Sequence, residues 1–145
     1  MSNSVYQIFG NQLRVRVCGI CIDCGKILLV NHQGLNHGDF WAPPGGGLHF
    51  GETAEDCLTR EFKEETGLEV EIGDFLFASE LIHKPLHAVE LFFLTSIRGG
   101  ILKTGIDPEM GDHQIITEVR FFNESEINQL KPAELHGIFE KAPKT

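Results

Sequence analysis

The residues best suited to chemistry lie in one stretch, Gly45 to Leu68, with the sequence GGGLHFGETAEDCLTREFKEETGL. Within it, Glu61, Glu64 and Glu65 are spaced so that two of their three pairs would be close neighbours on a helix surface. Three carboxylates gathered in this way offer hard oxygen ligands, which Mg²⁺ and Mn²⁺ prefer. The stretch therefore indicates a divalent-metal site.

A helix is predicted to position these carboxylates, over residues 54–66. Thr53 is a good N-cap, and Asp56 occupies the reciprocal capping-box position. No proline or glycine interrupts the segment, and Gly67 is well placed as the residue that ends it. Start and stop signals thus agree on the same helix.

The apolar face of this helix also carries charge. At about 100° per residue, Glu61 and Glu65 fall inside the apolar arc, and Glu64 lies at its edge. The arc is formed by Ala54, Cys57, Leu58 and Phe62. Like charges buried at a helix C-terminus are unfavourable unless they are compensated. Arg60 can pair with one carboxylate and a divalent cation with the others, whereas the alternative is a solvated acidic face.

Three consecutive glycines, Gly45–Gly47, precede the helix. Glycine backbone can approach a ligand or metal closely, although such a run is also typical of a flexible turn. The run does not match the phosphate loop G-x4-G-K-[ST], so we predict no P-loop nucleotide site.

The pattern G-x5-E-x7-R-E-U-x-E-E-x-G-U, with U aliphatic or aromatic, runs from Gly46 to Leu68 and resembles the Nudix box. Every fixed position is filled, and Phe62 is a mild departure from the more usual aliphatic residue. The flanking WAPPGGG and the later EVRFF, at 118–122, also resemble this family. The fixed positions are Gly46, Glu52, Arg60, Glu61, Phe62, Glu64, Glu65, Gly67 and Leu68.

The resemblance implies an α/β (α+β) fold, an α/β/α sandwich around a mixed β-sheet. It also implies Mg²⁺- or Mn²⁺-dependent hydrolysis of a nucleoside diphosphate linked to another moiety. That substrate would be a small phosphorylated nucleotide: a nucleoside triphosphate, ADP-ribose or a nucleotide sugar. The alternative is a non-catalytic, ligand-sensing module of the same fold, in which box carboxylates would be expected to be lost; this chain keeps them all.

Roles for individual residues follow from the same resemblance. Glu61, Glu64 and Glu65 would hold the metal, helped by a backbone carbonyl at Gly45 or Gly46. In addition, Arg60 would orient the carboxylates, while Glu52 and Gly67 would support the geometry of the loop and helix. A further acidic ligand or base is expected from a late loop or strand. Glu118 is the best positional match, ahead of Glu109 and Asp112.

Residues that contact the substrate are expected outside the helix. Arg14 or Arg16 on the first strand could bind a phosphate, or could be surface charges. Phe40 and Trp41 could stack on a base, with core packing as the alternative for Trp41. His87 lies at a predicted strand end and is a candidate pocket contact. The candidate substrate contacts are Arg14, Arg16, Phe40, Trp41, Gly45 and His87.

Composition narrows the choice of function class. The 145 residues are 41% hydrophobic and 23% charged, which favours one globular domain over 1–145. The net charge of −9 argues against a nucleic-acid polymer as partner. No apolar run has the length of a membrane helix and no export signal is visible, so we expect a cytoplasmic protein without membrane contact. A homodimer is possible by analogy with the family.

Other elements complete the predicted fold. Strands are expected at 13–22, 27–31, 68–82, 88–97 and 115–122, with helices at 124–130 and from Pro132 to about Glu140. Loops are expected at 32–39 and 102–113. Although Cys18, Cys21 and Cys24 have a metal-like C-x2-C-x2-C spacing, the strand pattern sends Cys18 and Cys21 to opposite faces. We therefore expect reduced, mostly apolar cysteines.

Overall fold

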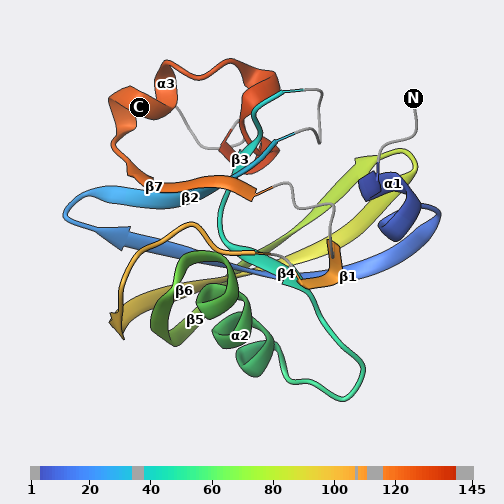
Figure 1. The fold of residues 1–145 in the computed structure, drawn as a ribbon, viewed down its shortest axis with the longest axis horizontal. Coiled ribbons are helices and arrows are strands. Elements are labelled where there is room, and N and C mark those ends of the chain that lie inside the picture. Colours follow the sequence, from blue (N-terminus) through green and yellow to red (C-terminus); the bar gives the residue numbers. More distant parts are fainter. Residues whose placement is uncertain (1–3, 34–37, 107, 111–115, 140–145) are drawn as a thin grey trace.

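A strongly bent mixed sheet and one long helix form the centre of the molecule (Figure 1). The computed structural model describes residues 4–33, 38–106, 108–110 and 116–139. The strands are β1 (Gln12–Asp23), β2 (Lys26–His32), β3 (Trp41–Ala42), β4 (Gly45–Gly47), β5 (Leu68–His83), β6 (Leu86–Gly100) and β7 (Ile116–Phe122). The helices are α1 (Ser4–Phe9), α2 (Ala54–Thr66) and α3 (Glu124–Asn128), with 3-10 turns at Pro108–Met110, Pro132–Glu134 and Gly137–Phe139.

The sheet follows the order β3-β2-β1-β6-β5, with β4 added to β1 and β7 added to β2. Strands β1 and β6 are parallel, in register from Gln12 opposite Leu86 to Cys21 opposite Thr95. The other pairs are antiparallel, which makes the sheet mixed as predicted. The register of β5 shifts between Ile72 and Phe75, and a glycine inside a strand, here Gly73, often marks such an irregularity.

Helix α2 has the predicted bounds and ends. The Thr53 hydroxyl accepts a hydrogen bond from the Asp56 amide, and Gly67 closes the helix with φ of 76°. Its apolar face packs against β1, β2 and β5, with Leu58 and Phe62 fully buried. A Cβ on Gly19 of β1 would lie 2.8 Å from Phe62 Cζ and closer still to Cε2 of the same ring, so a glycine is needed where the helix meets the strand.

The opposite face of β2 and β7 is covered by the C-terminal part of the chain (Figure 1). Leu29, Trp41 and Phe122 form this second core, and Ile127, Leu130, Leu135 and Phe139 pack against it. Neighbouring residues on β2 and β7, such as Leu28 and Phe121, face α2 instead. Helical layers on both faces confirm the predicted α/β/α arrangement.

Three local predictions need correction. A single helix over 132–140 is wrong, because Leu135 is extended (φ −131°, ψ 139°) and bridges Trp41, and the next amide, of His136, donates to the Trp41 carbonyl. Helix α1 was not expected, and the glycines of β4 pair as a strand rather than forming a loop. Some predicted positions lie outside the described residues. These are residues 107 and 111–113 of the predicted loop, the first residue of the predicted strand, Ile115, and the last residue of the predicted helix, Glu140.

The cysteines occupy the positions that the strand pattern predicts. Cys21 packs in the core beside α2, whereas the Cys18 thiol points to the other face. Cys57 is also buried, Cys24 is exposed, and all four are free thiols. In the described part of the chain, no helix is long and apolar enough to cross a membrane.

Candidate active site

The glycine strand β4 brings the backbone against the carboxylates of α2. The Gly45 amide donates a 2.9 Å hydrogen bond to Glu65 Oε1. A Cβ on Gly46 would lie 2.6 Å from Glu61 Oε2 and closer still to the carboxylate carbon. Only glycine, which has no Cβ, lets the Glu61 carboxylate lie against the strand at position 46.

Arg60 connects the loop before α2 to the helix. Its guanidinium binds Glu52 through two hydrogen bonds, Nε to Oε2 at 2.9 Å and Nη2 to Oε1 at 3.0 Å. Its Nη1 group also donates to Glu61 at 2.9 Å and to Glu64 at 3.3 Å. The hydrogen bond from Arg60 lowers the pKa of Glu52 to about 2. One arginine therefore fixes three carboxylates, in the orienting position that the family resemblance implies.

Glu61 and Glu65 are buried within the site, with 3% and 1% of their surfaces exposed. Burial, followed by repulsion from Glu65, raises the pKa of Glu61 to about 8. His32 Nε2 lies 3.7 Å from Glu65 Oε2. The helical periodicity of the sequence predicted both glutamates on the apolar face of α2, and their burial agrees with that prediction.

The donor set fits a hard divalent cation. Glu52, Glu61 and Glu64 share Arg60, and Glu65 adds a further carboxylate beside the Gly45 amide, so this group carries more negative than positive charge. Among the described residues, His, Cys, Asp and Glu side chains do not form a preassembled three-ligand centre. Here Glu61 and Glu64 face Arg60, and Glu65 faces the Gly45 amide. The oxygen chemistry and the surplus charge nonetheless match what Mg²⁺ or Mn²⁺ requires.

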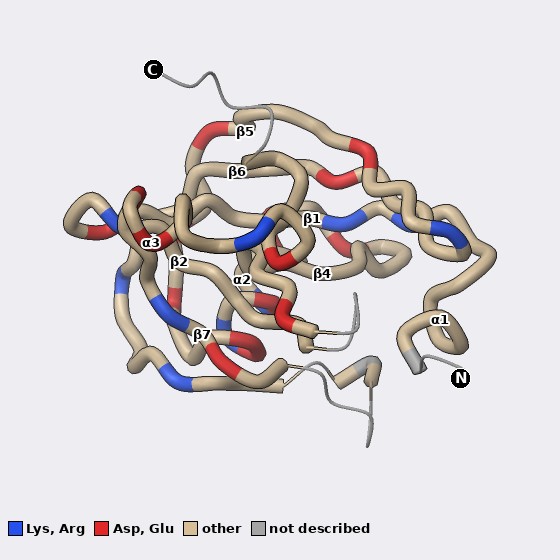
Figure 2. The backbone as a smooth tube through the Cα atoms, turned by 90° about the horizontal axis from the view of Figure 1, so that it is seen from above, with Lys and Arg blue, Asp and Glu red and all other residues tan. Residues whose placement is uncertain are grey.

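A cavity lies directly beside these carboxylates and has two different walls. One wall is polar and is formed by Arg16, His32, the glycines of β4, Glu61 and Glu65. The other is formed by the apolar residues Val5, Phe9, Leu81, Leu86 and Ala88, with the charged side chain of Arg14 over the Phe9 ring. Figure 2 shows several basic positions along β1. Such a pocket suits a ligand with a charged part and an apolar part.

Most of the predicted substrate contacts line this cavity: Arg14, Arg16, Phe40, Gly45 and His87. Arg14 lies over the Phe9 ring, 3.9 Å from its centroid. Trp41 is the exception, because it is 4% exposed and packs edge-on against Phe122. The core-packing alternative, and not base stacking, describes Trp41.

Glu118 does not join the carboxylates of α2, contrary to the positional match. Its side chain is 54% exposed, and Arg120 Nε lies 3.8 Å away. Side chains alternate along a strand, so Glu118 shares the face of Arg120, whereas Phe121 faces α2. Position in sequence could not reveal which face of β7 a residue occupies. The alternatives, Asp112 and the side chain of Glu109, lie outside the described residues.

Sequence reasoning missed a buried polar group next to the cavity. Glu90 on β6 is fully buried, and Arg16 Nη1 donates to it at 2.6 Å. His136 Nε2 lies 2.7 Å from its other oxygen. The signal was present, because Glu90 alternates with the buried residues Ala88 and Phe92 and thus had to point inward.

Comparisons with known proteins agree with this geometry. A family model described as the NUDIX domain matches residues 11–140. An ADP-ribose pyrophosphatase from Methanocaldococcus jannaschii is 36% identical over 95 residues, which are 64% of this chain and 56% of that protein. A NAD-capped RNA hydrolase from Vibrio atlanticus is 31% identical over 107 residues, which are 74% of this chain and 36% of that protein.

Solved structures show the same fold. The crystal structure of a MutT protein from Methanosarcina mazei Go1 superposes with a TM-score of 0.69 and 17% identity. The superposition covers 89% of this chain and 88% of that one. Against the curated relatives described above, by contrast, the chain spans 56% or less of their length.

Proposed function

This chain belongs to the NUDIX family, and from that premise we propose that it is a metal-dependent hydrolase of a phosphate anhydride. The substrate would be a nucleoside diphosphate linked to another moiety. The observation that carries the proposal is the meeting of Glu61 and Glu65 with the glycine strand, at a cavity that also holds Arg16; Arg60 joins Glu64 to Glu61.

Each residue has a distinct task in the proposed reaction. Glu61, Glu64 and Glu65 would hold Mg²⁺ or Mn²⁺, which would supply water activation and neutralisation of phosphate charge. Arg60 holds Glu61 and Glu64 in fixed orientations, and Glu52 holds Arg60. Arg16 binds phosphate oxygens from the polar wall.

Glu64 is the proposed proton acceptor. Its side chain is 25% exposed, whereas Glu61 and Glu65 are buried, so attacking water has the most direct access to Glu64. The water oxygen forms a bond to phosphorus, its proton passes to the Glu64 carboxylate, and the anhydride P–O bond breaks. The leaving phosphate keeps the electron pair of that bond.

The two walls of the cavity support a substrate that is charged at one end. Its diphosphate would face Arg16 and the α2 carboxylates, and its other moiety would face Phe9, Leu81 and Leu86. A curated relative is named ADP-ribose pyrophosphatase, so ADP-ribose enters the test as one candidate. Nucleoside triphosphates and nucleotide sugars are the others.

The test is a hydrolysis screen with Mg²⁺ and with Mn²⁺ over nucleoside triphosphates, nucleotide sugars, ADP-ribose and dinucleotides, with identification of products. We expect turnover that disappears with chelator. Glu64→Gln should lower kcat by about a thousandfold while the protein stays folded. Glu55→Gln, an exposed carboxylate on the first turn of the same helix, is the matched control and should keep wild-type turnover.

Two outcomes would contradict the proposal. Wild-type kcat in Glu64→Gln would remove this residue from the chemistry. Absence of turnover across the whole panel would favour the ligand-sensing alternative, which predicts nucleotide binding without product.

A further inference from the structure

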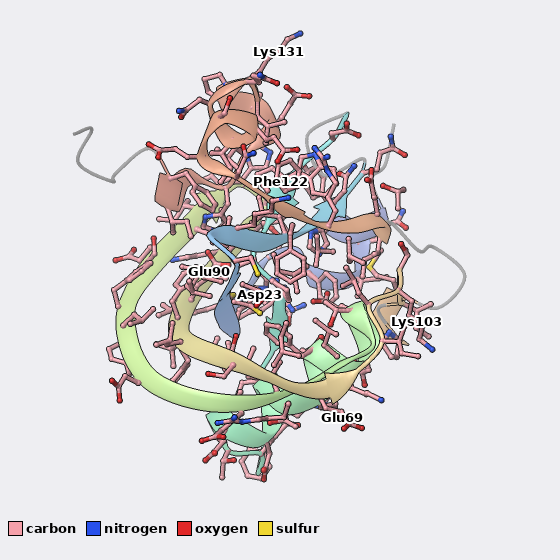
Figure 3. All side chains as sticks on the ribbon, turned by 90° about the vertical axis from the view of Figure 1, so that its left-hand side faces the viewer. Asp23, Glu69, Glu90, Lys103, Phe122 and Lys131 are labelled. Carbon is pink, nitrogen blue, oxygen red and sulfur yellow. The ribbon has the colours of Figure 1, made fainter. Side chains whose placement is uncertain are left out.

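A buried chain of polar side chains connects the cavity to the C-terminal segment. Glu90 is 0% exposed and lies inside the curve of the β5–β6 hairpin (Figure 3). One of its oxygens accepts from Arg16 Nη1 at 2.6 Å, and the other lies 2.7 Å from His136 Nε2. The Cys18 thiol is the third neighbour, 3.7 Å from the same oxygen as Arg16. A carboxylate this deeply buried is costly unless all these contacts hold.

The contacts of His136 define its protonation. The Ile138 amide donates to His136 Nδ1 at 3.1 Å, so this nitrogen is the acceptor. Nε2 then carries the proton and donates to Glu90. The guanidinium of Arg16 faces the other oxygen of Glu90 and balances its charge. His136 fixes the direction of the carboxylate without competing for its charge.

Besides Glu90, two carboxylates of α2 lie around the same cavity as Arg16. It lines the same polar wall as Glu61 and Glu65, and its Nη2 group donates to the Gly45 carbonyl at 3.4 Å. Burial opposes the charge of Arg16, but Cys18, Glu90, Glu65 and Glu61 together hold its pKa above the usual value. A guanidinium released from Glu90 would therefore be attracted to Glu65 and Glu61.

We propose that Glu90, oriented by His136, is a positioning residue that holds Arg16 at the substrate phosphate and away from the carboxylates of α2. The guanidinium has more N–H groups than its contacts with Glu90 and Gly45 use, so it can bind a phosphate while it remains anchored. The phosphate part of this inference rests on the proposed function. The part that concerns Glu61 and Glu65 does not.

The first experiment measures Mn²⁺ binding by titration calorimetry without any nucleotide. In Glu90→Gln, Arg16 should turn to Glu65 and Glu61 and weaken Mn²⁺ binding by roughly fivefold. Adding Arg16→Met to Glu90→Gln removes the competing cation and should restore Mn²⁺ affinity to the wild-type value or above it. Glu80→Gln, at an exposed carboxylate paired with the neighbour of Glu90 across the hairpin, is the matched control and should change nothing.

The second experiment compares kinetic constants on the substrate found in the screen. Glu90→Gln should raise KM on the order of tenfold with a smaller effect on kcat. The double variant should keep the high KM although its Mn²⁺ affinity has recovered. A residue that only supports the core would not separate these two readouts.

Folding is checked for every variant by circular dichroism and thermal unfolding. If Glu90→Gln does not fold, Glu90→Asp keeps the charge, shortens the reach to Arg16 and should shift both constants in the same direction by less. Wild-type Mn²⁺ affinity in a folded Glu90 variant overturns the inference. Weak Mn²⁺ binding that persists in the double variant also overturns it, because Arg16 would then not be the competitor. Neither result depends on whether any nucleotide is hydrolysed.

Discussion

Replacing Gly46 by alanine tests the geometry of the site most directly. The new Cβ would lie 2.6 Å from Glu61 Oε2, whereas ordinary contacts begin at 3.4 Å, so the carboxylate has to move by about 0.8 Å or more. Glu61 is held by Arg60 at 2.9 Å, and the movement would strain this pairing. A misplacement of about 1 Å at a catalytic group can lower a rate about a hundredfold.

The expected result is thus a kcat about a hundredfold below wild type, with little loss of stability, because the Glu61 side chain can give way. Steady-state kinetics and thermal unfolding measure the two effects separately. Gly38→Ala is the control, since no atom of the described residues lies within 4 Å of a Cβ there. Turnover near wild type in Gly46→Ala would refute the view that Glu61 must lie against β4.

Two further predictions concern the elements around the site. The pKa of Glu52 is lowered to about 2 by Arg60, so Glu52 contributes stability above its ordinary pKa of about 4.5, and this contribution is lost as pH falls from there to about 2. Unfolding free energies should thus fall less with acid in Glu52→Gln than in wild type; equal slopes would contradict the pairing. Gly105→Ala places a Cβ against the carbonyl oxygen of Glu64 and 2.7 Å from that of Glu65, which the Gly105 amide now caps, and should cost about 2 kcal/mol or more in denaturant unfolding. An unchanged midpoint would show that the 103–106 segment moves without penalty.

Local signals allowed helix α2 to be predicted in detail. Thr53 and Gly67 act within their own turns, and the burial of Glu61 and Glu65 follows from the periodicity of α2. Mixed pairing and layering followed from the family resemblance. These features depend on residues close in sequence or on a long gapless motif, so one sequence is enough to predict them.

Long-range contacts account for the errors. The sequence left two alternatives for Trp41, base stacking in the pocket and packing in the core. The contacts with Phe122 and Leu135 decide for the core. The predicted last helix does not form, because the bridge to Trp41 outweighs the local helix preference at Leu135. Glu90 meets Arg16 from 74 residues away, which no local pattern specifies.

The cavity combines both kinds of information, and this explains why the reaction is easier to infer than the substrate. Its polar wall comes mainly from the contiguous box and the adjacent glycines, so its chemistry is contained in one motif. Its apolar wall is assembled from α1 and from the two strand segments that flank the β5–β6 turn, and these two parts lie far apart in the chain. Changes at Val5, Phe9 or Leu86 could alter the second moiety that binds without touching a catalytic carboxylate. Substrate choice in this chain should therefore respond to substitutions in the apolar wall, and the rate of anhydride cleavage to substitutions in the polar wall.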